Sequence, residues 1–553
     1  HHLRGCLMLP PSYLDQMPDA FVKLAQQVED EILQDVARRI AKMDGITSTA
    51  NWQLWRYQQT EAVREDVVKL LAKYSGKSEA TIRRLLKEAA TEAMEREDSI
   101  YYHYGLDPTP FEESAALNNL LTAGARQTCG TWQNLTATTA NTVTGAFERT
   151  LDVAWGKVAT GAFDYKTAIK QAVDSLADDL PAVPYPSGHT DSLEVAARRA
   201  VLTGVNQTAG KLQEARMDEM GAEFVETSAH GGARPSHAEW QGKQFHRGGA
   251  VDYLGKHYPD FGKSTGYGTG AGLCGWNCRH SFFSIFPELG DPPTWTQEEL
   301  EALNARNIEC NGKMYTQYEI NQMQRARERN VRKWKKRYLA ETTTGALDKE
   351  DITKTAVRLR AAREELKHFV SATGGRLDSS RTSTAKFGRS EASKASAQSV
   401  RHFNDWSSSI GLRSPESLAE YYDIKYNKKE QWTVLRRDID TLTDISKKDW
   451  TDEFKAKAVD TFYGFKSAGV EISDHGVARF LSRHNGGKGF EPFTVDDIVQ
   501  QLRNPPNYLQ EDGREILFSG GRAIISNEDG VIVSIVLRKN AKADWREYIE
   551  SSE

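Results

Sequence analysis

The chain has 553 residues, a formal net charge of −5 and 27% charged residues. At roughly 100–200 residues per domain, this length predicts three to five structural units. A mean hydropathy of −0.61 with 39% hydrophobic residues favours long amphipathic helices with a wide polar face over one large globule. No stretch approaches the roughly 18 uncharged apolar residues of a membrane-spanning helix, which excludes a transmembrane helix. The acidic balance also argues against a uniformly basic nucleic-acid coat protein.

The five cysteines are too few for a disulfide scaffold, and their number is odd. The first seven residues include an arginine but no apolar core, so we expect no secretory signal, and Met8 is the more natural start of the protein. These features indicate a protein made in a reducing cytoplasm.

Residues 8–222 show helical periodicity, and we expect them to form a helical scaffold. The helices expected here cover residues 21–43, 58–74, 79–97, 147–161, 164–177 and 193–221. The third of them is expected to begin after Ser78, a helix-start signal. Residues 124–143 are rich in Thr and Asn, which is compatible with either a polar helix or an extended arm.

The composition changes after this scaffold. Residues 223–295 hold many Gly, His and aromatic residues and few periodic runs, which predicts a small, loop-rich α+β module. Residues 296–374 are helical and highly charged, and residues 375–399, rich in Ser, Thr and Lys, are typical of a linker. Residues 400–469 are expected to form a helical connector.

The charged helical region contains a concentrated basic segment. Between residues 321 and 339 there are eight Lys or Arg residues and one acid, Glu328. Such a run is either a solvated helix face or a nucleic-acid contact. The candidate contacts are Arg325, Arg329, Arg332, Lys333 and Lys336.

Four motifs follow one another through the module and this helix. They are SAHGGARPSHAEWQGKQF (228–245), HYPDFGKSTGYGTGAG (257–272), LCGWNCRHSFFSIFPELG (273–290) and MYTQYEINQMQRARERNVRKWKKR (314–337). Together they resemble the phage minor capsid protein 2 family, over roughly residues 8–395. The resemblance implies a head component of a phage or prophage, made in the bacterial host cytoplasm and located in the virion near the portal vertex. It implies portal and major capsid proteins as partners, and it is compatible with self-association and DNA contact.

The module also contains a candidate metal site. Cys274-x3-Cys278-x-His280 can fold a loop around one tetrahedral ion, with His237 or His230 as the fourth ligand. A module with little apolar core would gain stability from a structural zinc ion. The alternative is a hydrogen-bonded structural corner, with Trp240 and Trp276 as core. Related head proteins often carry paired cysteines before the motif, where this chain has Ser236 and His237.

Residues 470–553 predict a small α+β domain with an antiparallel sheet. Helices are expected over residues 475–483 and 495–502, and strands over 514–518, 522–526 and 531–537, with Gly-containing hairpin turns between them. The string ISDHGVARFLSRH (472–484) resembles the phage-borne barnase/EndoU/colicin/RelE-like nuclease group. The expected overall class is therefore a multidomain protein with a mainly α N-terminal part and a C-terminal α+β domain.

The nuclease resemblance has a chemical interpretation. His475, Arg479 and Arg483 follow at four-residue steps on one helix face, where a histidine can act as acid or base on RNA and arginines can bind phosphate. Ser534 is assigned to the same cleft by position alone. In the opposing interpretation, His475 is only a neighbour of the helix N-cap and the two arginines form ion pairs. From residue 471 onward, 10 Lys/Arg against 14 Asp/Glu give a net charge of −4, which disfavours non-specific RNA binding.

Three function classes compete. The first is a structural head protein carrying an RNase-like toxin domain, or an inactive version of it. The second is a toxin or effector nuclease with a phage-derived delivery region. The third, an ADP-ribosyltransferase-like enzyme, is disfavoured because Arg381-Thr382-Ser383-Thr384 falls in the expected linker and not in a strand.

Overall fold

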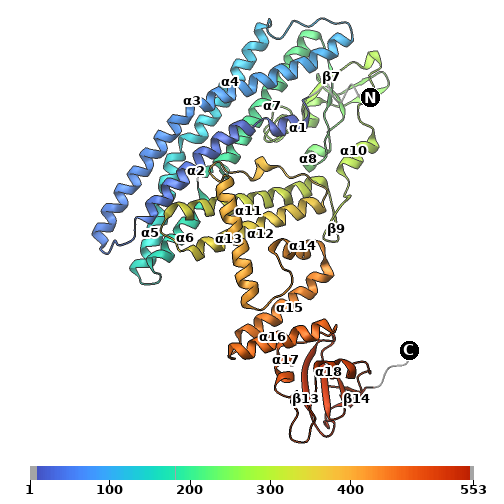
Figure 1. Cartoon of the computed structure of the whole chain (residues 1–553). Coiled ribbons are helices and arrows are strands. Elements are labelled where there is room, and N and C mark those ends of the chain that lie inside the picture. The colour runs from blue at the N-terminus through green and yellow to red at the C-terminus, as the bar shows by residue number, and fades with distance from the viewer. Residues whose placement is uncertain (1–8, 181, 549–553) are drawn as a thin grey trace. The chain divides into compact units, whose positions relative to one another are not determined.

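The computed structural model describes residues 9–180 and 182–548 (Figure 1). The chain divides into two compact units, with the boundary between Gln398 and Ser399. Residues 1–8, which include the expected start at Met8 and the segment in which no secretory signal was expected, lie outside the described residues.

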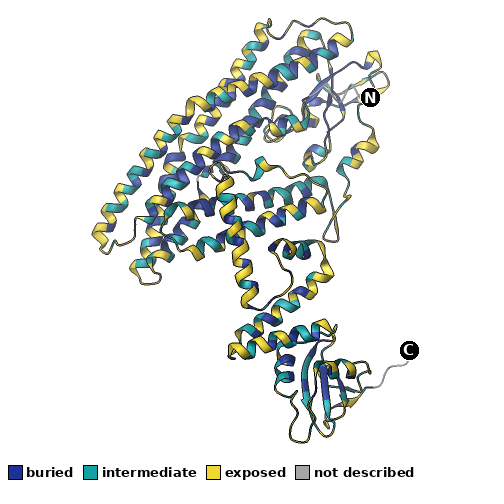
Figure 2. Ribbon diagram, viewed as in Figure 1, coloured by how far each residue is buried: buried dark blue, intermediate teal, exposed yellow. Residues whose placement is uncertain are grey.

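Helices make up most of the first unit, which confirms the predicted mainly α class of the N-terminal part. Its long helices are α2 (Asp19–Ala41), α3 (Thr49–His103), α4 (Ala115–Ala137), α5 (Thr139–Ala159), α6 (Tyr165–Asp179), α7 (Leu193–Met220), α11 (Gln317–Thr344) and α12 (Lys349–Ala372). Its short helices are α1 (Pro11–Gln16), α8 (Pro235–Ala238), α9 (Phe261–Thr265), α10 (Gln297–Asn304), η2 (Pro287–Leu289) and η3 (Ser379–Thr382). Figure 2 shows buried and exposed residues alternating around the long helices, as amphipathic segments require.

Helix α3 is a single helix of 55 residues where two were expected. Ser78 was predicted to start the second of them, but its hydroxyl donates to the carbonyl of Tyr74 at 2.9 Å, within the helix. The true N-cap is Ser48, whose side chain accepts from the backbone N–H of Asn51. At 1.5 Å per residue the helix is roughly 80 Å long.

Helices α4 and α7 cross at unusually close range. A Cβ atom on Gly124 would lie 2.2 Å from Oγ1 of Thr208, and one on Gly204 would lie 2.2 Å from Oγ1 of Thr128. Each threonine hydroxyl donates to the carbonyl four residues before it, Thr128 to Gly124 at 2.8 Å and Thr208 to Gly204 at 2.7 Å. The Thr- and Asn-rich segment 124–143 is thus helical and not an extended arm, since it lies in α4 and the start of α5. Its small residues allow α7 to pack closely against α4.

The loop-rich module contains a three-stranded antiparallel sheet in the order β4-β3-β7. The strands of the first unit are β1 (Ala182–Pro184), β2 (Thr190–Ser192), β3 (Phe224–Thr227), β4 (Gln244–His246), β5 (Val251–Tyr253), β6 (Lys256–Tyr258), β7 (Phe282–Ile285), β8 (Ile308–Cys310) and β9 (Lys313–Tyr315). The module was expected to have little apolar core, but a cluster rich in phenylalanine fills it, and Tyr101 of α3 and Met217 of α7 join that cluster. The module is thus anchored on the ends of two scaffold helices.

The expected linker, residues 375–399, is instead folded onto α2. It contains η3 and the beginning of α13 (Arg389–Ser409). The Ser383 carbonyl accepts from Gln26 at 3.1 Å, and the Lys386 backbone N–H donates to Asp30 at 2.7 Å. The polar composition that suggested a linker reflects hydrogen bonding to buried polar residues of α2.

The second unit combines helices with a five-stranded antiparallel sheet in the order β13-β12-β11-β10-β14, which confirms the predicted C-terminal class. After α13 its helices are α14 (Leu418–Asn427), α15 (Lys429–Lys447), α16 (Asp452–Ser467), α17 (Asp474–Leu481) and α18 (Val495–Gln501). Its strands are β10 (Tyr508–Leu509), β11 (Glu515–Ser519), β12 (Arg522–Ser526), β13 (Ile532–Leu537) and β14 (Arg546–Glu547). One apolar cluster joins α15, α16 and α17 to the inner face of the sheet, so the expected boundary near residue 470 does not separate two cores.

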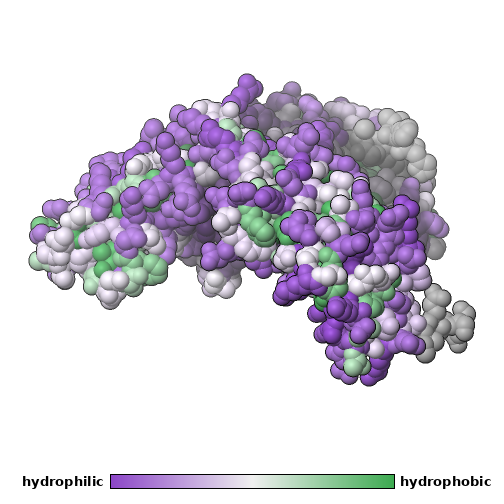
Figure 3. All heavy atoms as spheres, turned by 60° about the horizontal axis from the view of Figure 1, so that its bottom comes forward, coloured by the Kyte–Doolittle hydropathy of each residue, from purple (hydrophilic) through white to green (hydrophobic). Residues whose placement is uncertain are grey.

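None of the helices in the described ranges is both long and apolar enough to cross a lipid bilayer. The face of the molecule in Figure 3 is mostly hydrophilic, with scattered apolar patches.

Candidate metal centre and neighbouring cavity

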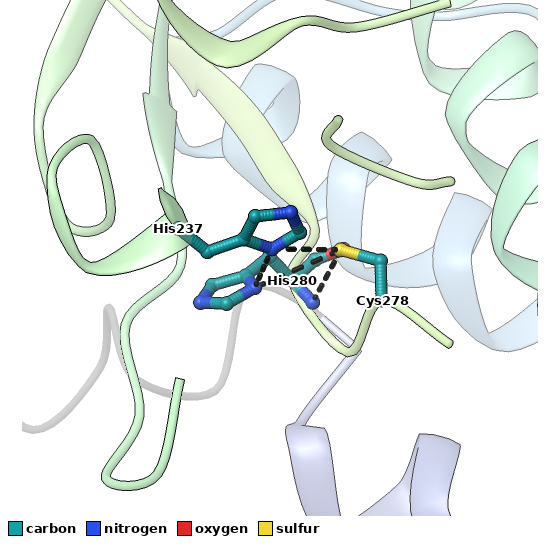
Figure 4. Close-up of side chains that lie close together, drawn as sticks. All are labelled: His237, Cys278 and His280. Carbon is teal, nitrogen blue, oxygen red and sulfur yellow. Dashed lines mark hydrogen bonds between the residues drawn. The ribbon is translucent and has the colours of Figure 1, made fainter. Parts of the chain in front are cut away.

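Three side chains with metal-binding atoms meet in the loop-rich module. His237 lies in α8, and Cys278 and His280 lie in the segment before β7 (Figure 4). The Nδ1 atoms of the two histidines are 3.4 Å apart, and Sγ of Cys278 is 3.8 Å from Nδ1 of His237 and 3.7 Å from Nδ1 of His280. All three residues are buried, and their candidate ligand atoms lie within 4.8 Å of one another, so this group can hold a metal ion.

The local chain geometry fixes these positions. Pro235 opens α8 at its first turn, where its missing N–H costs nothing. Asn277 adopts a left-handed φ of 53°, which turns the chain immediately before Cys278. From α7, the side-chain amide of Asn206 donates to the carbonyls of Cys278 at 3.0 Å and His280 at 3.1 Å. A scaffold helix therefore holds the Cys–His segment, and no sequence pattern marks Asn206 for this role.

Hydrogen bonds outside the group set the histidine tautomers. Nε2 of His237 contacts the carbonyl of Ala271 at 2.9 Å, an acceptor only, so Nε2 carries the proton. Nε2 of His280 contacts Oε1 of Gln241 at 3.0 Å, and the backbone N–H of His230 donates to that same oxygen. Both Nδ1 atoms are therefore lone-pair donors directed into the group, as metal-binding histidines require.

Burial keeps both histidines in their neutral form. Burial lowers the pKa of His237 to about 4 and moves that of His280 well below its ordinary value. Burial also raises the pKa of the Cys278 thiol. Metal coordination reverses this last effect, because a bound cation deprotonates a coordinating thiol.

Two predicted members of the site lie elsewhere. Cys274 is buried but outside the group, because its Sγ packs towards α7, 3.3 Å from where a Cβ on Gly210 would lie. The ring of His230 lies against that of His280 in a tilted arrangement, with centroids 4.4 Å apart, but its ligand atoms are not in the group. Trp240 is buried as expected, whereas Trp276 is 61% exposed and does not belong to the core.

A cavity of about 460 Å³ adjoins the three ligands. His237, Cys278 and His280 form part of its wall, and four arginines, Arg199, Arg234, Arg279 and Arg325, contribute to the rest. A metal ion bound by the three side chains would therefore face this cavity.

The basic helix α11 is neither a solvated face nor a free basic surface. Its charges pair with acids of other helices: Lys336 with Glu29 at 2.9 Å, Arg332 with Glu194 at 2.6 Å, and Lys333 with Asp178 at 3.0 Å. Lys336 and Glu29 are both buried. These three cations have internal partners that compete with phosphate. Of the five candidates, Arg325 lines the cavity and Arg329 is exposed.

The comparison with known proteins bears on the whole of this region. A model of the family described as phage minor capsid protein 2 matches residues 9–371. The chain belongs to this family. The matched region of this minor capsid protein contains the candidate metal-binding group, the cavity and α11.

Two curated relatives agree with this assignment. The minor capsid protein is 28% identical to a "Structural protein" of Lactococcus phage LL-H over 245 residues, which cover 42% of this chain and 62% of the relative. It is 38% identical to a "Structural protein" of Lactococcus phage mv4 over 93 residues, which cover 17% of this chain and 66% of that relative. The chain thus spans less than two thirds of each relative's length. No solved structure matches it.

The C-terminal candidate residues of this minor capsid protein are only partly brought together. His475 is exposed on α17, and its Nε2 accepts from Nε of Arg479 at 3.1 Å. The guanidinium of Arg483 donates to the backbone carbonyl of Ile535 on β13. Ser534 pairs in register with Ile525, whose apolar cluster lies on the sheet face opposite the one that contacts α17. Ser534 therefore does not share a cleft with His475.

Proposed function

We propose that this minor capsid protein is a virion component of the phage head. In this role it contacts the portal and major capsid proteins during head assembly, DNA packaging or ejection, and is made in the cytoplasm of the bacterial host. The family match over residues 9–371 is the observation that supports this role. Self-association through its long helices and contact with packaged DNA belong to the same proposal.

Purified phage particles test this proposal. Mass spectrometry of gradient-purified heads is expected to detect the protein at a few copies per particle, with the portal protein as a reference of known low copy number. Chemical crosslinking of the same particles is expected to join it to portal or major capsid protein. Its absence from particles, with the protein present in the lysate, would favour a free toxin or effector.

We further propose that His237, Cys278 and His280 bind a structural zinc ion. The supporting observation is the pair of Nδ1 lone pairs directed at each other and at Sγ, an arrangement that a borderline-soft cation stabilises. When bound, the ion supplies a crosslink between α8 and the segment before β7. Three protein ligands leave the fourth position to a group in the cavity.

Metal analysis of the purified full-length protein tests the zinc proposal. We expect one zinc per chain, lost in Cys278→Ser and in His237→Ala. Cys310→Ser and His257→Ala are matched controls, because neither residue belongs to the group, and both variants are expected to keep the metal. A metal-free wild-type protein purified without chelator would refute the assignment.

A second candidate function is RNase activity of the C-terminal domain. Its supporting observation is that exposed His475 accepts a hydrogen bond from Arg479, which places a titratable imidazole beside a phosphate-binding guanidinium. The full-length protein incubated with total RNA is expected to cleave it, and His475→Ala to lose the activity. Equal cleavage by both proteins would exclude His475, and no cleavage by the wild type would favour an inactive domain.

A further inference from the structure

The cavity beside the metal-binding group has a wall of one charge sign. Arg199 comes from α7, Arg234 precedes α8, Arg279 lies between two of the ligands, and Arg325 comes from α11. No aspartate or glutamate is among the residues of the described chain that line it. Arginines from four segments therefore line one open cavity.

Two of these four arginines form an ion pair with an acid. Asp191 pairs with Arg199 at 2.8 Å. Asp15 pairs with Arg279 at 2.9 Å, but it also pairs with Arg381 at 2.5 Å, so one carboxylate serves two cations. Arg234 donates to the neutral carbonyl of Trp276 at 2.5 Å. Positive charge is therefore in excess around the cavity.

Two N–H donors of these arginines have no hydrogen-bond acceptor among the described residues. Nε of Arg199 and Nε of Arg279 are buried without a hydrogen-bond partner in the part of the chain that the structure describes. Arg325 forms no ion pair with any described residue, and burial together with Arg279 and Arg381 lowers its pKa to about 10. Arg234 and Arg325 thus have no carboxylate partner among the described residues, and partly buried cations of this kind favour a bound anion.

We propose that this cavity binds a phosphate group through Arg199, Arg234, Arg279 and Arg325. Guanidinium forks match the oxygens of phosphate in pairs, and several arginines around one site are typical of phosphate recognition. A volume of about 460 Å³ also admits the sugar or base attached to a phosphate. The phosphate belongs either to a nucleic-acid strand or to a free phosphate or mononucleotide. The inference rests on the arginines and holds whether or not the neighbouring group binds zinc.

Binding measurements on the full-length protein test this inference. The probes are inorganic phosphate, followed by calorimetry, and a fluorescein-labelled 12-nucleotide single-stranded DNA, followed by anisotropy at fixed salt. We expect the wild type to bind phosphate and Arg325→Gln to bind it about tenfold more weakly or worse, because a charged hydrogen bond is lost. Arg358→Gln, at an exposed position on α12 outside this cavity, is the matched control and is expected to stay within twofold of wild type.

The two probes also identify the source of the phosphate. If the oligonucleotide binds and inorganic phosphate displaces it, the ligand is a nucleic-acid strand. If only inorganic phosphate binds, the ligand is a free phosphate or a mononucleotide. Arg234→Gln is a second cavity variant for the case in which Arg325→Gln does not fold. The inference is overturned if the wild type binds neither probe, or if folded cavity variants bind as tightly as Arg358→Gln.

Discussion

His237 and His280 present their Nδ1 atoms to each other at 3.4 Å, while each donates its Nε2 proton to a different acceptor outside the pair. Two lone pairs at this distance repel unless a cation lies between them. The acceptors are the carbonyl of Ala271, in a glycine-rich loop, and Oε1 of Gln241. The loop and the glutamine thus set the ring orientations on which the proposed metal binding depends.

Gln241→Ala is expected to weaken zinc binding about 10- to 100-fold, because the His280 ring then loses the acceptor that fixes its tautomer. Competition with a chromogenic chelator measures this affinity in the folded protein. Gln297→Ala is the control, since that side chain is exposed and contacts Glu301 on α10. Equal affinities for the two variants would show that Gln241 does not act on the site.

The close crossing of α4 and α7 predicts that larger residues at its glycines destabilise the protein. Gly124→Ala and Gly204→Ala are each expected to lower the free energy of unfolding by about 1–3 kcal/mol, because the new methyl group overlaps a threonine side chain of the facing helix. Gly130→Ala lies in the same helix with no atom within 4 Å of its Cβ position. This control is expected to be neutral, or to stabilise by roughly 0.5–1 kcal/mol through helix propensity.

Chemical unfolding followed by tryptophan fluorescence distinguishes these variants. A Gly124→Ala protein as stable as Gly130→Ala would mean that the helices separate without cost. The double variant Gly124→Ala/Thr208→Ala, which removes the overlapping side chain, is expected to show a favourable coupling energy between the two positions.

Only some residues of the candidate site could be predicted from the sequence. His237, Cys278 and His280 were identified because soft ligands stood close together or within one family motif. Cys274 was included by spacing, yet spacing carries no information on its left-handed φ of 59° or on its packing against α7. The arginines of the cavity come from four segments, and their convergence is a property of the tertiary fold alone.

The fold was predictable where the signals are local. Strands β11, β12 and β13 lie within one residue of their expected positions, because Gly-containing turns delimit them. Polar residues that form hydrogen bonds inside the folded chain were misjudged. Ser78 is an internal helix residue, and residues 375–399 pack on α2, because each finds its hydrogen bonds within the folded chain.

The buried carboxyl group of Glu97 is expected to make the stability of the protein depend on pH. Its carboxylate is fully buried in α3 and accepts from Tyr101 at 3.0 Å and from Ser284. Burial raises its pKa from 4.5 to about 7, so between these values the folded state holds a proton that the unfolded chain has released. Stability from this group is therefore complete below about pH 4.5 and falls as the pH rises towards 7.

Glu97→Gln is expected to reduce the loss of stability between pH 5 and pH 8 by roughly 2–3 kcal/mol, because the neutral amide cannot titrate. Unfolding midpoints at the two pH values measure the difference. Glu95→Gln, an exposed position on the same helix, is expected to keep the wild-type dependence. An unchanged dependence in Glu97→Gln would show that this carboxyl ionises without cost to the fold.

The C-terminal unit is expected to fold only when its preceding helices are present. Phe465 of α16 meets Phe480 of α17 edge to face at 5.2 Å, and both belong to the cluster that covers the inner face of the sheet. A fragment of residues 399–553 should therefore unfold cooperatively, whereas residues 470–553 should lack fixed tertiary structure by near-ultraviolet circular dichroism. Within the longer fragment, Phe465→Ala is expected to cost about 3–5 kcal/mol, and the less buried Phe454→Ala clearly less. A well-folded fragment 470–553 would instead place the domain boundary at residue 470 and make α15 and α16 dispensable for the sheet.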